Sequence, residues 1–301
     1  MLIAETAQAF ELAELGVLRV HGPDAVRFLQ GQLSQDIERL ASGARLAGLH
    51  NPQGRVIAVL RLAQTEPHEI LAVLPQELLT AVIERLRRFV LRAKVSLSDA
   101  STLWCVRGVL TGAADELARA LESGGAPAAT RGIWLPVDAT RAWLLSARAS
   151  AVASAPVQGS REHWRQLDIA AGLPQVYRAT TEAFVAQMLN LDLVDAIAFD
   201  KGCYTGQEVI ARAHYRGRVK RRMQRFRSRA RVALRPGERR VLADGRTLVV
   251  IEASELADGR TEFLAVAPLA VSAGAPEPDE PGDAGAAVLE AEPLPLPYRV
   301  E

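Results

Sequence analysis

The sequence predicts an α+β fold that ends in a strand-rich part. Strand-like runs, some of them in pairs, alternate with helix-like segments in the larger N-terminal part, which argues against a parallel, doubly wound sheet. Two Asp-Gly turns flanked by β-prone runs, at 244–245 and 258–259, indicate a β-meander near the end. The chain has 301 residues, 49% of them hydrophobic, which is enough for two or three subdomains.

The N-terminal elements follow one another in a regular order. Residues 14–20 alternate like a strand, Pro23 and the apolar spacing after it predict a helix, and Gly31 can end that helix. The segment NPQGR at 51–55 has the composition of a turn. The strands expected after it, paired across 64–68, are 56–63 and 69–74.

The middle of the chain repeats this alternation. Apolar residues at i, i+3, i+4 and i+7 predict a helix over 79–90. The segments after it predict, in order, a strand at 102–110, a helix at 114–121, strands at 132–137 and 142–147, and helices at 160–172 and 181–191.

The pattern of the sequence changes near residue 213 from alternating helix-like and strand-like segments to strand-like segments, and we place a domain boundary there. Residues 213–301 predict a small β-barrel or sandwich, and residues 1–212 predict the α+β region. The segment 273–287 is rich in Pro, Gly and acidic residues without a helical or strand period, so we expect a loop there.

Composition argues against several classes of function. The net charge is +1, so any electrostatic function depends on local clustering. We expect a cytoplasmic protein with reduced thiols, because there is no apolar run long enough for a membrane span, no basic leader, and only two cysteines, Cys105 and Cys203. Phosphate-loop, dinucleotide, paired-cysteine, zinc-protease and nucleophile-elbow motifs are absent, and the five histidines are scattered, so no permanent metal site is expected.

The segment DKGCYTGQEVIARAHYRGRVKRR, residues 200–222, is the strongest candidate for a site. Two glycines bracket Cys203 and predict a tight loop. Lys201 and Arg212 supply positive charge, which favours the reactive thiolate form of cysteine. Lysine is also unusual here, because only 3 of the 36 basic residues are lysines. The alternative is a glycine turn that carries a buried, structural cysteine.

Positive charge continues downstream of this loop. Residues 209–237 contain eleven Lys or Arg and no Asp or Glu. A strand of period two would place four of these arginines on one face, namely Arg225, Arg227, Arg229 and Arg231. A polyanion such as tRNA, or a polyglutamylated small molecule, could offset these charges. The alternative, which is the more usual case for a run of charges, is that the six acidic residues of 273–292 offset them within the chain.

Several motifs together resemble a known family. KGCYTGQE at 201–208, followed by AR and RG, resembles the signature of the YgfZ family, folate-binding proteins related to the T-protein aminomethyltransferase of the glycine cleavage system. HGPDAVRFLQGQLSQDI, NPQGRV, AAGLP and EPLPLPY resemble further family segments along the chain. The resemblance implies two interleaved α+β subdomains in 1–212 and a C-terminal β-barrel in 213–301, around a cleft for folate.

The resemblance also implies a function. It implies an accessory protein that binds tetrahydrofolate or a folate derivative and supports iron–sulfur client enzymes, including the radical enzyme that methylthiolates tRNA. Cys203 would act as a redox thiol or transient cluster ligand, with Lys201 and Arg212 holding it ionised. The residues that we assign to the folate site on this basis are Trp164, Tyr204, Gln207, Glu208 and Arg212.

The sequence departs from the related transferases at two acidic positions. Ala58 and Val59 stand where the transferases carry an aspartate that assists the folate amine, so aminomethyl transfer is not expected. Ala170 stands where they carry a pterin-recognising acid. The alternative function is a one-carbon transferase. It would need another acid in place of the missing ones, and Asp168 and Glu208 are the candidates.

Overall fold

The computed structural model describes residues 7–122, 132–149, 157–217, 219–269 and 288–300. Three sheets and several helices confirm the α+β class. The chain forms two compact units, each built from separate segments. Unit 1 comprises Met1–His50, Ala58–Trp164 and Ala196–Thr205; unit 2 comprises Asn51–Ile57, Arg165–Asp195 and Gly206–Glu301. The boundary near residue 213 stays a prediction; that residue lies within helix α6 (Gln207–Arg216).

A five-stranded sheet in the order β3-β4-β5-β2-β6 forms the first core. Its strands are β2 (Leu15–His21), β3 (Arg45–His50), β4 (Val56–Glu66), β5 (Glu69–Pro75) and β6 (Ser96–Asp99). β4 and β5 pair antiparallel, as the sequence predicts. Helix α1 (Ala25–Gln30) follows β2, and helix α2 (Gln76–Arg87) covers the sheet with five buried apolar side chains at helical spacing.

A second, four-stranded antiparallel sheet has the order β1-β7-β9-β8. Its strands are β1 (Gln8–Glu11), β7 (Trp104–Leu110), β8 (Ile133–Pro136) and β9 (Arg141–Ala147). Two of the predicted helices belong to this part of the chain, α3 (Ala114–Glu122) and α5 (Arg161–Ala170). The sequence did not indicate β1, a short strand that pairs with β7 and makes a further parallel bridge from Phe10 to Gly159.

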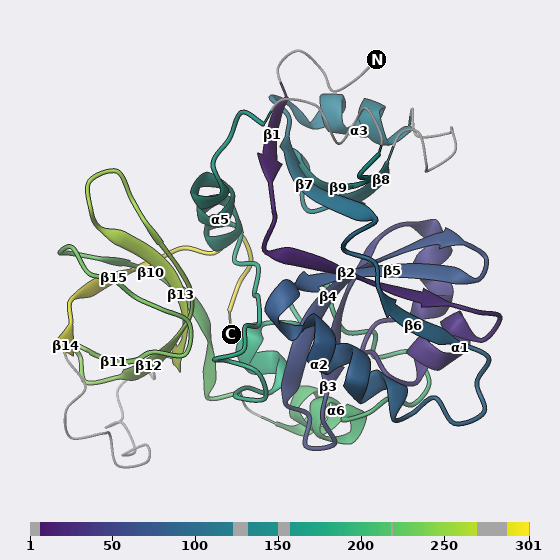
Figure 1. Cartoon of the computed structure of the whole chain (residues 1–301). Helices are drawn as coiled ribbons and strands as arrows, with labels where there is room; N and C mark the ends of the chain where they lie inside the picture. The colour runs from purple at the N-terminus through teal and green to yellow at the C-terminus, as the bar shows by residue number, and fades with distance from the viewer. Residues whose placement is uncertain (1–6, 123–131, 150–156, 218, 270–287, 301) are drawn as a thin grey trace. The chain divides into compact units, whose positions relative to one another are not determined.

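The third sheet, in unit 2, is nearly closed into a barrel, and its six strands curl round in Figure 1. Its order is β14-β11-β12-β13-β10-β15. The strands are β10 (Arg221–Ser228), β11 (Arg239–Leu242), β12 (Thr247–Glu255), β13 (Thr261–Pro268), β14 (Val288–Leu289) and β15 (Ala291–Leu294). The two edge strands are separated in sequence by Glu290 alone, so the sheet must bend until its edges meet. Phe226 and Phe263 stack at its centre, 5.5 Å apart.

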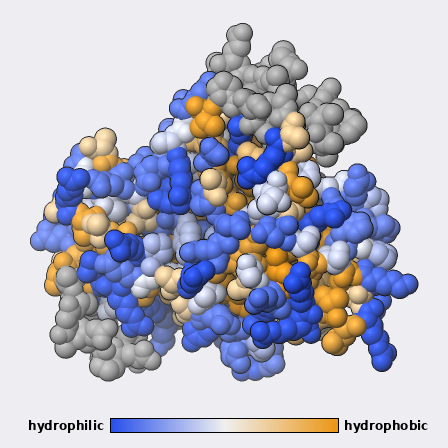
Figure 2. Space-filling model, in the orientation of Figure 1, coloured by the Kyte–Doolittle hydropathy of each residue, from blue (hydrophilic) through white to orange (hydrophobic). Residues whose placement is uncertain are grey.

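Both predicted Asp-Gly turns join neighbouring strands of this barrel. Gly245 and Gly259 have φ of 86° and 82°, a backbone conformation that glycine adopts readily and other residues avoid. The predicted loop 273–287 lies outside the described residues. Figure 2 shows mostly hydrophilic residues on the visible face, with hydrophobic residues in smaller groups. No helix among the described residues has the length and apolar character needed to cross a membrane.

Two local predictions are wrong. Only a short 3₁₀ turn, η2 (Ala186–Leu189), forms within the helix expected over 181–191, because Glu182 and Asn190 have φ of 58° and 57°, which no right-handed helix allows. Strand β10 ends at Ser228, so the four alternating arginines do not share one strand: Arg229 and Arg231 lie beyond its end.

Candidate functional site

Cys203 lies on the loop that precedes helix α6. Its side chain is exposed, whereas Cys105 is buried on β7, so the alternative of a buried structural cysteine at 203 is wrong. Gly206 adopts a φ of 84° immediately before the helix, which confirms the need for glycine there. Gly202 has open space around it and no such constraint. The loop therefore presents a thiol to solvent at the start of a helix.

Lys201 fixes this loop to the chain segment that follows helix α1. Its ammonium donates hydrogen bonds to the backbone carbonyls of Gln30, Leu33 and Gln35 at 2.7, 2.8 and 2.8 Å. An ammonium has three donors that can converge on three oxygens, which a planar guanidinium cannot do. All three donors are used, so none remains for the sulfur of Cys203. Burial lowers the pKa of Lys201 to about 8, against the opposing effect of the Asp36 and Glu38 carboxylates.

Tyr204 packs into the interior behind the same loop. It is 7% exposed, and the ammonium of Lys201 lies 5.1 Å from the centre of its ring. The ring of His50 lies 6.3 Å away on the other side. Burial raises the pKa of the Tyr204 phenol. Among the predicted site residues, the structure thus brings Lys201 and Tyr204 into direct contact.

Trp164 is enclosed in unit 1. It is 3% exposed and packs against Phe10, with ring centroids 5.2 Å apart, while the guanidinium of Arg141 lies 5.2 Å from its ring. A side chain at Gly108 would collide with the indole, so this glycine provides the space for it. The ring therefore offers little exposed surface, and its place beside a folate ligand stays a prediction.

The remaining predicted residues lie on helix α6 in unit 2. Glu208 and Arg212 form an exposed ion pair of 3.0 Å, one helical turn apart. Gln207 is half-buried at the start of the helix. The i,i+4 pair is a helix signal that the sequence analysis overlooked.

The segments that resemble family motifs meet in pairs within each unit. Lys201 joins the KGCYTGQE segment to the N-terminal one through Gln30. The hydroxyl of Tyr298 donates to the carbonyl of Gly172 at 2.6 Å, which joins EPLPLPY to AAGLP. A Cβ placed at Gly54 would lie 3.0 Å from that of Val209, so the NPQGRV turn packs tightly on α6.

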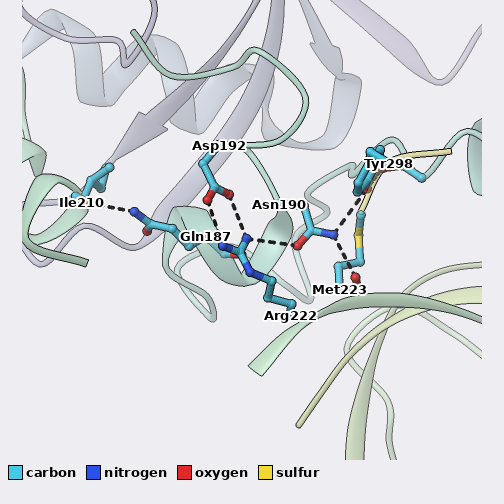
Figure 3. A network of polar contacts seen from close by, with 8 residues as sticks. Gln187, Asn190, Asp192, Ile210, Arg222, Met223 and Tyr298 are labelled. Atoms are coloured by element: carbon cyan, nitrogen blue, oxygen red, sulfur yellow. Dashed lines mark hydrogen bonds and ion pairs between the residues drawn. The ribbon is translucent and has the colours of Figure 1, made fainter. Parts of the chain in front are cut away.

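Sequence reasoning missed a buried polar network in unit 2, drawn in Figure 3. Arg222 makes a two-point ion pair with Asp192, with both distances 2.9 Å, and donates to the carbonyl of Gln187 at 3.0 Å. The amide of Gln187 donates to the Ile210 carbonyl at 2.7 Å, and that of Asn190 donates to the Met223 carbonyl at 2.8 Å. Polar residues inside the apolar run QMLNLDL were the signal that could have found it.

A buried carboxylate, Glu252 on β12, was also missed. Burial raises the pKa of Glu252 to about 7, against the opposing effects of Arg165, 3.3 Å away, and the hydrogen bond from Tyr177. The charge of Asp168, two residues before Ala170 on α5, acts on the same carboxyl and raises its pKa further. The carboxylates of Asp168 and Glu252 therefore lie in the region of Ala170, the position at which the transferases carry an acid.

The basic run has carboxylate partners within the chain. Arg225 pairs with Glu262 at 2.7 Å, and Arg227 lies 3.4 Å from Glu262 and 3.7 Å from Glu292. Arg231 pairs with Glu255 at 2.8 Å. Only Glu292 among these partners comes from the acidic segment that the sequence suggested. Binding of tRNA to this arginine set stays a prediction.

The buried His50 predicts a pH dependence of stability. Burial lowers the pKa of His50 to about 3, with a smaller opposing effect from the Gly48 backbone, while an unfolded chain titrates at about 6.5. The unfolded state therefore binds more protons between these values, and stability is lost as the pH falls below about 6.5. We expect a loss of about 2 kcal/mol between about pH 6.5 and about pH 5 from this residue.

Urea unfolding at several pH values measures the effect. His50→Gln removes the titrating group, and we expect a shallower loss of stability in acid than in the parent. His68, which is exposed, provides the control for the substitution itself, because replacing an exposed side chain should change stability by less than about 0.5 kcal/mol. Equal acid sensitivity of the His50→Gln protein and the parent would contradict the prediction.

Comparisons with known proteins agree with these features. No protein-family model matches the chain. It is 33% identical over 219 residues to an uncharacterized protein of Haemophilus influenzae, with 72% of each chain covered. It is 31% identical over 269 residues to the tRNA-modifying protein YgfZ of Serratia proteamaculans, which covers 82% of this chain and 80% of that one. The protein of the same name from Colwellia psychrerythraea is 28% identical, covering 70% of this chain and 68% of that one.

A solved structure shares the fold. The glycine cleavage system aminomethyltransferase T from Bartonella henselae matches with a TM-score of 0.61 over 87% of this chain and 78% of that one, at 15% identity. At this identity the likeness concerns the fold alone, and it agrees with the aminomethyltransferase-like fold that the resemblance implied. The family is identified by the similarity to the Serratia proteamaculans protein over most of both chains. The chain belongs to the YgfZ family.

Proposed function

We propose that this protein supports the modification of tRNA by acting as an accessory factor for iron–sulfur enzymes, with folate as its ligand. Its relatives in Serratia proteamaculans and Colwellia psychrerythraea are named tRNA-modifying proteins. The observation that carries the proposal is the exposed thiol of Cys203, on a loop that Lys201 anchors through three carbonyls. An anchored loop with an accessible thiol suits contact with a partner protein.

Thiol chemistry supports the role of Cys203. The thiolate is the form that ligates iron and exchanges with disulfides, and both need access to the sulfur. A lone cysteine suits a transient role, since stable clusters take several cysteine ligands. Among the residues that the structure describes, no group of three or more His, Cys, Asp or Glu is arranged to hold a metal ion. In this proposal the iron–sulfur cluster belongs to the client enzyme, such as a radical tRNA methylthiotransferase, and not to this protein.

The residues present fit folate in part. A pterin has polar edges that need partners when buried, and Asp168 and Glu252 retain carboxylates in the region of Ala170. Arg212 is exposed and offers a cation for the anionic glutamate tail, although Glu208 competes for it. Trp164 fits less well, because its ring is enclosed. Bound tetrahydrofolate would carry one-carbon groups on its N5 and N10 nitrogens, and the chain's own part is to bind and orient it.

Aminomethyl transfer, the alternative, has less support. The fold is shared with an aminomethyltransferase, but Ala58 and Val59 are 0% and 2% exposed within β4. These positions belong to the hydrophobic core here, so no group at either can exchange protons with a ligand. Turnover of methylene-tetrahydrofolate with an amine acceptor would revive the alternative.

Replacement of Cys203 tests the proposed function. In a strain that lacks the protein, we expect Cys203→Ser to leave methylthiolated tRNA at the level of the deletion strain, as measured by mass spectrometry of tRNA nucleosides. The matched control is Cys105→Ala, which removes the buried cysteine and should restore the modification. Full restoration by Cys203→Ser would overturn the role of the thiol.

Calorimetric titration with tetrahydrofolate separates the two parts of the proposal. We expect the parent and Cys203→Ser to bind it equally, because the thiol is not among the residues assigned to the ligand. A parent protein that does not bind tetrahydrofolate would overturn the folate part while leaving the thiol part to the genetic test.

A further inference from the structure

Unit 2 contains a cavity of about 610 Å³ that none of the predicted site residues lines. Small-molecule sites in proteins commonly have volumes of about 300–1,000 Å³. Part of its lining is polar and comes from the buried network, with Gln187, Asp192 and Arg222; we call this part the polar wall. The apolar lining residues include Val219, Leu269 and Val300. A lining of mixed polar and apolar character suits a flat ring with polar edges.

The polar wall is held in place by internal hydrogen bonds and carries no net charge. Gln187 is 1% exposed, and its amide nitrogen donates to the Ile210 carbonyl, which fixes the orientation of the amide (Figure 3). Its Oε1 is buried and has no hydrogen-bond partner among the described residues. Arg222 and Asp192 neutralise each other, with side chains 9% and 7% exposed. Because Oε1 has almost no accessible surface, it is not offered to a ligand; the wall favours a neutral ring, such as a nucleobase, because its one ion pair carries no net charge.

The rim of the cavity is cationic and aromatic. His214 lines the cavity, and the ring of Tyr215 packs edge-on against it, with centroids 4.8 Å apart. Tyr215 is 69% exposed, which is unusual for so large an apolar ring. Arg216 and Lys220 are exposed on the two sides of Gly217, which also lines the cavity. Exposed aromatic rings beside cations are the combination that single-stranded nucleic acid uses, with bases on the rings and phosphates on the charges.

We propose that this cavity binds one unpaired nucleotide of an RNA chain, with the base against the Gln187 wall, a neighbouring base on Tyr215, and phosphates at Arg216 and Lys220. This inference rests on the proposed role in tRNA modification and gives it a contact surface on the RNA. RNA is favoured over an acidic protein segment because the volume of the cavity admits a ring and because an acidic peptide has no use for the exposed tyrosine.

The test measures binding of a fluorescein-labelled single-stranded RNA of about ten nucleotides by anisotropy, from about 50 to about 200 mM salt. We expect Tyr215→Ala to weaken binding about 10-fold at every salt concentration, because a stacked base loses its support. Arg216→Ala should weaken it and also lower the slope of log affinity against log salt by about 0.7. Tyr215 and Arg216 are exposed, so neither replacement should perturb folding.

A matched control lies at the end of helix α2 in unit 1. Arg88 and Phe89 form an exposed arginine–aromatic pair there, as Tyr215 and Arg216 do at the end of α6. Arg88→Ala and Phe89→Ala should leave RNA affinity unchanged. In addition, RNA that contains 4-thiouridine should crosslink on irradiation to the peptide that carries His214 and Tyr215, and Tyr215→Ala should reduce the yield.

The outcomes separate the nucleotide site from the proposed function. Parent-like RNA affinity of Tyr215→Ala, or a loss in Arg216→Ala alone that polyglutamate competes away, would overturn the nucleotide site in favour of a general anion surface. Neither result bears on Cys203, whose test is the restoration of tRNA modification. Conversely, restoration by Cys203→Ser would leave the RNA measurements standing.

Discussion

Replacing Lys201 with methionine is expected to lower the free energy of unfolding by about 3 kcal/mol. The ammonium bonds to the carbonyls of Gln30, Leu33 and Gln35, and a charged hydrogen bond contributes about 1.5–3 kcal/mol. The loss should be smaller than three such bonds, because water can reach part of this half-buried site. Lys201→Arg should not restore stability, since a flat guanidinium cannot serve three converging oxygens.

Urea unfolding of the purified variants measures this effect. Lys94 provides the matched control, because its side chain is exposed and Lys94→Met should change stability by less than about 0.5 kcal/mol. A Lys201→Met protein as stable as the parent would mean that these hydrogen bonds do not hold the loop. Separately, mobility of the freed loop should increase the rate at which Cys203 reacts with a thiol reagent.

Arg222→Met is expected to destabilise the protein by about 3–5 kcal/mol. The change leaves the carboxylate of Asp192, whose side chain is 7% exposed, without a cationic partner. It also removes a donor from the carbonyl of Gln187. The double variant Arg222→Met with Asp192→Leu should recover part of the loss, because no buried charge is then left alone.

A double-mutant cycle gives the coupling between the two side chains. We expect the double variant to be more stable than the sum of the single effects predicts, by at least about 1 kcal/mol. The exposed pair of Arg231 and Glu255, with side chains 80% and 55% exposed, serves as the control and should show little coupling. Additive effects at 192 and 222 would show that the pair does not act as a unit.

The sequence predicted the elements that depend on local patterns. Alternation and turn chemistry identified β4, β5 and the Asp-Gly hairpins, because each depends on residues within a few positions. The helix expected over 181–191 does not form because Glu182 and Asn190 adopt positive φ, and the side chains of Gln187 and Asn190 bond instead to carbonyls of α6 and β10. Such partners are remote in sequence and outweigh the local apolar period.

The sequence predicted where in the chain the candidate site lies, but not which contacts its residues make. Lys201 stood out as a rare lysine, yet its partner Gln30 is 171 positions away and no local pattern indicates it. The exposure of Cys203 could not be read from spacing, because the same glycines suit a buried turn. The arginines downstream have acidic partners within the chain, as one of the two alternatives predicted. Most of these acids lie in the β-meander and not in the segment 273–292.

The two edge strands of the barrel, β14 and β15, have a consequence for how the protein is made. Until residues 288–294 leave the ribosome, the free sides of β10 and β11 have no neighbours, and open strand sides recruit other chains. Nascent or proteolytically clipped forms that lack this short tail should therefore need chaperone protection, although most of the sheet is already synthesised.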